Sequence, residues 1–285
     1  MIKLEKNVWY YIGLVFLFTY TIQIIAISIT DENSFIPQIL VALTMFIPGI
    51  AAIIYLIKTK QGLKYIDWHM GKIKYLLLSL ILPILITLIG ILVFEHTGLA
   101  SNNVFLINNG QVHSIETPLI FGSDQQGILF FILNFFVTGI LFSLPTSFLA
   151  IGEEIGWRGF LQKKLLEKNN LFKSLTFLGV LWGFWHFPLI INGFNYPEYP
   201  MLGAFLFFPL SVIFVSYFIG WLTINSKSVW PAVFAHGAMN SVMVFMFEMD
   251  FGKNKLEGNF SILGLWVLIG MISFYLISKK TIKNS

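Results

Sequence analysis

The sequence predicts an all-α integral membrane protein with about eight transmembrane helices and both termini in the cytoplasm. Three observations predict this fold class. The 285-residue chain is 56% hydrophobic and only 11% charged, whereas an average protein is about 25% charged. Its mean hydropathy is +0.79. Apolar runs of the ~20 residues needed to cross a bilayer recur along the chain.

The first apolar run follows a basic start, as in a signal peptide, but it is longer than such a peptide's apolar region and no cleavage site of small residues follows it. We therefore interpret it as a retained first span. The predicted spans are residues 8–29, 36–57, 74–95, 129–151, 172–192, 202–225, 231–249 and 261–278. They form a single transmembrane domain over residues 1–285. The longest break, residues 96–128, is rich in Asn, Gly and Ser and is predicted to be an extracytoplasmic loop with room for a short hairpin.

The lysines give these spans a consistent orientation. If the N-terminus is cytoplasmic and eight spans follow, all but two of the 18 basic residues fall in segments on the cytoplasmic side. The two exceptions are Lys253 and Lys255. Basic residues concentrate on the cytoplasmic side of membrane proteins, and a seven-span arrangement would flip some of these loops and lose the asymmetry. The lysines therefore favour eight spans with both termini in the cytoplasm.

Composition also excludes several function classes. The chain has no cysteine, so disulfides and thiolate chemistry are absent. The isoelectric point of about 9.1 reflects the orienting lysines, because the chain has no block of five or more like charges and no nucleic-acid-binding motif. We expect the lipid bilayer as its surroundings and no nucleic-acid partner. The lysine-rich, arginine-poor composition suits a bacterium, so we expect a multi-pass protein of a bacterial plasma membrane.

A cluster of charge interrupts the apolar pattern in FLAIGEEIGWRGF, residues 148–160. On a helix that continues from the fourth span, Glu154 and Arg158 are four residues apart on one face, in the orientation that favours an ion pair. Glu153 is rotated by about 100° from Glu154 and does not face Arg158. We expect Arg158, the chain's single arginine, to neutralise Glu154, which leaves Glu153 available for chemistry. Taken alone, the cluster also fits a simple charged segment at the membrane surface.

Two histidines lie inside predicted spans. His186 is in the fifth span, with Trp182 one helical turn earlier on the same face and Pro188 two residues later. His236 and Asn240 are four residues apart in the seventh span and project from one face. A single such histidine is as often structural as functional, but polar groups on three separate spans favour a shared site inside the bundle. The small residues beside them, which allow close helix approach, are Gly183, Gly237 and Ala238.

These motifs, in this order, resemble the signature of the CPBP family of intramembrane endopeptidases, the CAAX-protease and bacteriocin-processing enzymes related to the type II CAAX prenyl endopeptidase. The matching residues are Glu153-Glu154-x-x-x-Arg158, Trp182-x-x-x-His186 and His236-x-x-x-Asn240. The resemblance covers roughly residues 120–250, with a motif-bearing core of four helices over residues 127–250. The remaining spans fit the family's eight-helix architecture without a specific motif. One departure is Trp182, where the family more often has Phe.

The resemblance implies a site that hydrolyses peptide bonds. Glu153 is the implied general base that polarises a water molecule, and His186 helps to hold that water. His236 and Asn240 are the implied donors to the oxyanion of the tetrahedral intermediate. The implied supporting residues are Glu154, Arg158 and Trp182.

We expect the site to work without a cofactor. The chain has no H-E-x-x-H motif, and the resemblance favours a glutamate-activated water without a metal. A zinc ion on Glu153, His186 and His236 is the alternative, because two histidines and a carboxylate form a common zinc site.

The leading hypothesis is therefore an intramembrane endopeptidase of the glutamic type that cleaves membrane-anchored peptides or proteins. One alternative is a non-catalytic membrane protein of bacteriocin immunity or abortive infection. A proton-coupled transporter is a further alternative, against which we count the lack of an inverted repeat and of paired broken helices. The sequence predicts no particular oligomeric state.

A shared site sets one geometric condition. His186 lies ~20 Å along the fifth span from its inner end, whereas Glu153 lies near the inner end of the fourth span. The two side chains can meet only if their depths in the bilayer are matched. We predict that the fourth helix continues past Arg158, so that the apparent loop after it is partly helical.

Overall fold

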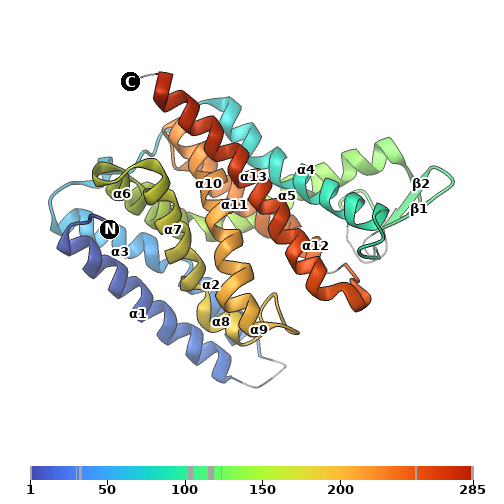
Figure 1. Cartoon of the computed structure of the whole chain (residues 1–285), viewed down its shortest axis with the longest axis horizontal. Helices are drawn as coiled ribbons and strands as arrows, with labels where there is room; N and C mark the ends of the chain where they lie inside the picture. Colours follow the sequence, from blue (N-terminus) through green and yellow to red (C-terminus); the bar gives the residue numbers. More distant parts are fainter. Residues whose placement is uncertain are drawn as a thin grey trace.

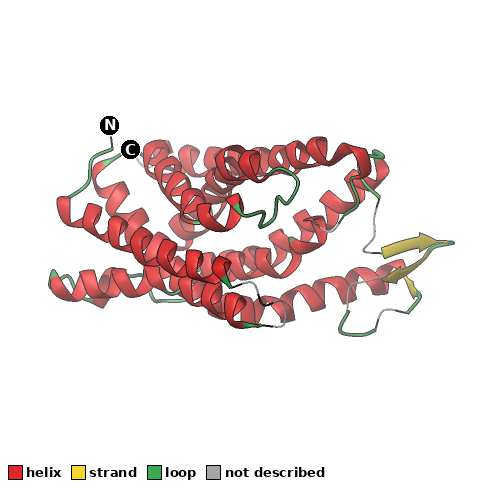
Figure 2. Ribbon diagram, turned by 90° about the horizontal axis from the view of Figure 1, so that it is seen from below, coloured by secondary structure: helices red, strands yellow, loops and turns green. Residues whose placement is uncertain are grey.

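The protein is a bundle of helices with a small sheet at one end (Figures 1 and 2). The computed structural model describes residues 2–29, 31, 34–101, 105–114, 119–122, 124–247 and 249–283. The α-helices are α1 (Lys6–Ser28), α2 (Ile36–Thr44), α3 (Ile47–Lys58), α4 (Ile73–His96), α5 (Ile128–Glu154), α6 (Gln162–Lys168), α7 (Leu171–Trp185), α8 (Phe187–Ile191), α9 (Pro200–Leu202), α10 (Phe208–Ser226), α11 (Trp230–Val242), α12 (Val244–Phe247) and α13 (Lys255–Lys283). Two π-helical segments, η2 (Ile155–Leu161) and η3 (Gly203–Phe207), join α5 to α6 and α9 to α10.

In the described part of the chain, six helical stretches are long and apolar enough to cross a membrane. They are Lys6–Ser28, Ile36–Lys58, Ile73–His96, Ile128–Lys168, Pro200–Ser226 and Gly252–Lys279. The predicted fifth and seventh spans are helical as well, but their helices α7 and α11 have only 15 and 13 residues. The prediction of a polytopic helical protein is confirmed, while the count of eight crossings stays a prediction.

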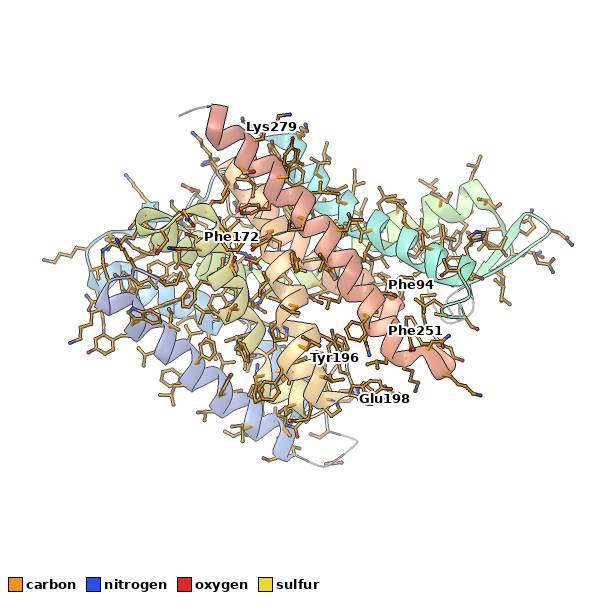
Figure 3. All side chains as sticks on the ribbon, viewed as in Figure 1. Phe94, Phe172, Tyr196, Glu198, Phe251 and Lys279 are labelled. Atoms are coloured by element: carbon orange, nitrogen blue, oxygen red, sulfur yellow. The ribbon has the colours of Figure 1, made fainter. Side chains whose placement is uncertain are left out.

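Large apolar side chains cover the outside of the bundle. Leu17 of α1, Phe148 of α5 and Tyr275 of α13 are all more than half exposed, and side chains project outward along every long helix in Figure 3. In a bilayer these faces contact lipid tails that are as apolar as leucine. The start of α1 and the end of α13 lie on the same side of the bundle (Figure 1). That this side is cytoplasmic stays a prediction.

Two of the predicted spans are broken rather than continuous. The second span divides into α2 and α3 at Met45 and Phe46, and the fifth divides into α7 and α8 at His186. A proline follows each break, Pro48 or Pro188, within the first two positions of the new helix. Proline has no N–H to donate and clashes with the preceding turn, so a helix tends to end before it. The second span is still one helical stretch long enough to cross a membrane. His186, expected in the middle of a span, lies at the junction of two helices.

A small sheet interrupts the all-α fold within residues 96–128. It consists of β1 (Phe105–Asn108), β2 (Gln111–Ser114) and β3 (Gln126–Gly127) in the order β1-β2-β3, with antiparallel neighbours. Asn109 and Gly110 form the turn between β1 and β2 with φ angles of 49° and 74°. Asn-Gly is the preferred pair for such a two-residue hairpin turn. The predicted short hairpin is confirmed. Residues 102–104, 115–118 and 123 of this segment lie outside the described residues.

Helices α5 and α11 approach each other closely, and glycine makes this possible. A Cβ atom on Gly237 would overlap the side chain and backbone of Ser147. The hydroxyl of Thr146 donates to the Gly237 carbonyl oxygen at 2.8 Å, and the Ser241 hydroxyl donates to the Gly139 carbonyl oxygen at 3.2 Å. Small residues and hydroxyl bonds of this kind hold membrane helices together. The close approach predicted for Gly237 is confirmed.

We predict that Gly237→Ala destabilises the protein by about 1–3 kcal/mol, because the added methyl group would meet the backbone of α5, which cannot move away without shifting the helix. Thermal unfolding in detergent measures the effect. Gly13→Ala is the matched control, because Gly13 is also in a helix and nothing lies within 4 Å of its added Cβ. Equal melting temperatures for the two variants would contradict the prediction.

Candidate active site

The helix that carries the two glutamates continues well past them. α5 passes without a break into η2 and then α6, so the helical stretch extends to Lys168. The Gln162 N–H donates to the Trp157 carbonyl oxygen, five residues back. Such π-helical turns are rare and frequently occur at functional sites. The prediction that the fourth helix continues past Arg158 is confirmed.

Glu154 forms the centre of a buried ion-pair network. Its Oε1 atom accepts from Arg158 Nη1 at 3.0 Å and from His236 Nδ1 at 2.8 Å. The Glu154 and Arg158 side chains are both 0% exposed. The predicted pair between them is therefore confirmed. The contact with His236 was not predicted, and it ties α11 to the helix of the two glutamates.

Glu153 points to a different partner, as its rotation from Glu154 requires. The indole Nε1–H of Trp182 donates to Glu153 Oε2 at 2.8 Å. Glu153 is 1% exposed, so this bond replaces part of the solvation that the carboxylate loses on burial. The expectation that Arg158 neutralises only the second glutamate is consistent with this geometry. Glu153 is nevertheless held in place by Trp182.

Trp182 connects the charged groups. The Arg158 guanidinium lies over the Trp182 ring with Cζ 4.1 Å from the ring centroid, which is a cation–π contact. The His236 ring meets the same indole edge-on at 5.3 Å between centroids. One side chain of α7 therefore fixes groups from α5, η2 and α11 through its face, edge and N–H.

The hydrogen bond of His186 determines which of its ring nitrogens is free. Nδ1 lies 2.9 Å from the Trp182 carbonyl oxygen. A carbonyl oxygen only accepts, so Nδ1 carries the proton and Nε2 of the neutral ring is an acceptor. The ring also packs edge-on against Trp185 and Phe208, at 4.7 and 4.8 Å between centroids. His186 is therefore oriented by α7 and α10 together.

All four predicted catalytic residues border one cavity of about 470 Å³. They are Glu153, His186, His236 and Asn240, and Trp182 lies on the same wall. Other walls come from α1, α2 and the loop between α8 and α9, whose Tyr196 is labelled in Figure 3. The cavity is large enough for several residues of an extended peptide, and its lining is mainly apolar.

The charges around Glu154 balance if His236 is protonated. Two carboxylates, Glu153 and Glu154, face one guanidinium, Arg158, in a nearly water-free environment. A buried net charge is costly, so the cluster requires one further positive charge or one proton. An imidazolium at His236 would supply it, with Nδ1–H on Glu154 and Nε2–H available to the cavity.

The described residues do not form a ready metal site. Among them, no three histidine, aspartate or glutamate side chains are grouped as ligands of one ion. In the alternative site on Glu153, His186 and His236, the glutamate accepts from Trp182 and both Nδ1 atoms bond to other groups. These bonds leave Glu153 Oε1 and the two Nε2 atoms free, as in many zinc sites, but among the described residues they are not grouped around one ion position. The absence of a metal stays a prediction.

A cluster of polar side chains anchors the end of the same helix. Lys163 of α6 donates to the Tyr65 carbonyl oxygen and pairs with Asp67 at 3.2 Å, and Tyr65 donates its hydroxyl to Glu167 at 2.6 Å. Burial and, secondarily, the bond to Glu167 raise the pKa of Tyr65. The loop between α3 and α4 thereby holds α6 in position.

Two contacts of the site escaped the sequence analysis. The bond from Trp182 to Glu153 has a sequence signal, because a buried indole N–H needs an acceptor and Glu153 was the unassigned carboxylate. The bond from His236 to Glu154 has no sequence signal, because Arg158 already gives Glu154 a partner in the sequence. It follows from the tertiary contact between α5 and α11.

The long apolar helices and their exposed apolar faces define a multi-pass membrane protein, with polar groups gathered at one interior cavity. Residues 124–242, less than half of the chain, match the family model described as type II CAAX prenyl endopeptidase Rce1-like. The resemblance to this family is confirmed over that segment, which contains all three motifs.

The chain is also similar to two known proteins. CAAX prenyl protease 2 of Methanococcus maripaludis is 33% identical over 106 residues, which are 34% of this chain and 39% of the relative. Lysostaphin resistance protein A of Staphylococcus haemolyticus is 24% identical over 252 residues, which are 84% of this chain and 60% of the relative. The matches thus span 39% and 60% of the lengths of these relatives.

We predict that Arg158→Lys lowers the free energy of unfolding by roughly 1–3 kcal/mol and Arg158→Ala by more, about 3–5 kcal/mol. A lysine ammonium cannot lie flat on the Trp182 ring while it also pairs with Glu154. Alanine removes the guanidinium altogether and leaves Glu154 Oε1 with the bond from His236. Unfolding in detergent measures the loss. Lys173→Ala, at an exposed position of α7, is the control. Wild-type stability of Arg158→Lys would show that the planar guanidinium is not needed.

Proposed function

We propose that the protein is an intramembrane endopeptidase that hydrolyses peptide bonds with a water molecule activated by Glu153. The convergence of the four polar groups on one cavity carries this proposal. The match of residues 124–242 to a family of membrane endopeptidases supports it.

In the first step Glu153 acts as general base. Its Oε2 is occupied by the indole N–H of Trp182, which leaves Oε1 to take a proton from water. His186 accepts the second hydrogen of that water at Nε2, the nitrogen left free by the bond to the Trp182 carbonyl. The water oxygen is thereby oriented toward the substrate carbonyl carbon and attacks it. General-base catalysis of this kind contributes ~10²–10⁴ in rate.

The attack places a negative charge on the former carbonyl oxygen. The side-chain amide of Asn240 and, when His236 is protonated, its Nε2–H donate to this oxyanion. His236 can donate there only as an imidazolium, because Nδ1 already donates to Glu154. Each donor of this type contributes ~10²–10³ in rate.

Collapse of the intermediate breaks the C–N bond. Glu153 returns the proton it took from water to the leaving amine, so the products are a new carboxyl group and a new amine. The carboxylate is regenerated without any covalent enzyme intermediate. Glu154, Arg158 and Trp182 keep their places throughout and hold Glu153 and His236 in position.

The substrates we propose are membrane-anchored peptides or proteins that enter the cavity from the bilayer. The mainly apolar lining of the cavity and its place inside a membrane bundle support this class. One relative's name refers to prenylated CAAX substrates and the other's to lysostaphin resistance. A bacterial plasma membrane remains our proposed location.

A non-catalytic immunity role and a proton-coupled transporter are less well supported. An immunity protein needs neither an oriented His186 nor a restrained Glu153. The breaks at His186 and Phe46 remove one argument against a transporter, but the match to an endopeptidase family favours hydrolysis.

We predict that Glu153→Gln and His186→Ala each lower peptide release at least ~100-fold. The glutamine keeps the size and the acceptor for Trp182 but is not a base. Mass spectrometry of peptides released from membranes of cells that express each variant measures the effect, and a peptide found only with the wild type then serves as a synthetic substrate.

Glu257→Gln is the matched control, because Glu257 is exposed at the start of α13, away from the cavity. It should release the same peptides as the wild type. Thermal unfolding shows that the inactive variants are folded. Unchanged release by Glu153→Gln, or no difference between the wild type and both inactive variants, would rule out the proposed mechanism.

We further predict that hydrolysis of the synthetic substrate changes by less than about twofold after treatment with EDTA or 1,10-phenanthroline, because no catalytic step requires a metal ligand. Added zinc should not raise the rate of protein treated in this way. Loss of activity with a chelator and its recovery with zinc would favour the alternative site on Glu153, His186 and His236.

A further inference from the structure

One polar side chain in the cavity wall comes from outside the segment that matches the endopeptidase family. Gln23 lies on α1, is fully buried, and lines the same cavity as Glu153 and His186. The family match begins only at residue 124. The motifs therefore give Gln23 no role.

The other polar side chains along this part of α1 have partners. The Tyr11 hydroxyl donates to the Pro48 carbonyl oxygen at 3.2 Å. Thr19 Oγ1 accepts from Trp185 Nε1 at 2.8 Å, and the Tyr20 hydroxyl donates to the Phe184 carbonyl oxygen at 2.6 Å. Gln23 is different, because neither Oε1 nor Nε2 has a partner among the described residues.

The partners of Thr19 and Tyr20 also place Gln23. They fix α1 against the last turn of α7, which ends at Trp185. Gln23 is one helical turn further along the same face, about 6 Å beyond Thr19. It is therefore beside the junction of α7 and α8, where His186 enters the cavity.

A buried carboxamide without partners is unfavourable, and folded proteins retain few such groups without a reason. Its C=O and NH₂ lie side by side in one plane. In an extended peptide the N–H and C=O of one residue also point to the same side, so a side-chain amide can bond to both. An extended peptide in the cavity would offer both complementary groups. A lipid chain would offer neither.

We propose that Gln23 positions the substrate by binding the backbone N–H and C=O of one substrate residue adjacent to the scissile bond, with Nε2–H donating to the carbonyl oxygen of that residue and Oε1 accepting its N–H. This assignment rests on the proposed endopeptidase activity. Gln23 does not touch the reacting atoms, and its bonds are the same before and during the reaction. Such an interaction lowers KM and leaves kcat unchanged.

The test uses the synthetic peptide whose release depends on Glu153, with purified full-length protein in detergent. Gln23→Met keeps the length and volume of the side chain but removes its donor and acceptor. It should raise KM by about tenfold, with kcat within about twofold of the wild type. Its melting temperature should be equal or higher, because an unpaired amide is removed. Gln38→Met, at an exposed glutamine of α2, is the matched control and should change neither constant.

Substrate variants identify the contact. Peptides that are N-methylated at one backbone nitrogen at a time lose one N–H each. At one position the methyl group should raise KM for the wild type but have a much smaller effect for Gln23→Met, because the partner is already absent. This coupling separates a direct contact from a general change in the cavity.

The outcomes for the two proposals are distinct. If the wild type releases no peptide that depends on Glu153, the endopeptidase proposal fails and the role of Gln23 fails with it. If hydrolysis depends on Glu153 but Gln23→Met keeps the wild-type KM, or no N-methyl position is coupled to Gln23, only the role of Gln23 is overturned. A lower melting temperature of Gln23→Met with unchanged KM would make Gln23 a structural residue.

Discussion

The site depends on one buried carboxylate oxygen. Glu154 Oε1 accepts from Arg158 and His236 at once, and it thereby joins η2 to α11 inside an apolar bundle. The Arg158 guanidinium would not be stable there alone, because removing a charge from water is compensated only by a close partner. The Arg158 guanidinium in turn supports the face of Trp182, whose N–H restrains Glu153. Glu153, through Trp182, and His236, directly, are therefore both held by contacts that depend on Glu154.

The sequence predicted the helices and the members of the site more accurately than their connections. Runs of apolar residues placed a helix at every predicted span, because length and hydropathy are local properties. The i to i+4 pair of Glu154 and Arg158 followed from helix geometry alone. The charge pattern also separated Glu153 from Glu154, and the structure gives these two acids different partners.

Other features depend on contacts between distant segments and were not predictable. The bond from His236 to Glu154 joins residues 82 positions apart and exists only because Gly237 lets α11 approach α5. The helix break at His186 has a local cause in Pro188. It was not predicted, because the apolar residues continue on both sides of the break and look like one span. α7 and α11 are shorter than a usual span, and sequence hydropathy alone did not reveal this. Gln23 escaped notice because its significance lies in the partner it lacks.

The π-helical segment has an evolutionary consequence. Its turns hold one residue more than α-helical turns would, so deletion of a single codon within η2 would let an ordinary α-helix form. The extra residue is taken up within η2, so its deletion would leave the faces of α6, with Lys163 beside Tyr65 and Asp67, nearly unrotated relative to α5. A deletion in the α-helical turns on either side would instead rotate everything after it by about 100° about the helix axis. A change of length by one residue is therefore better tolerated within η2 than in the turns that flank it.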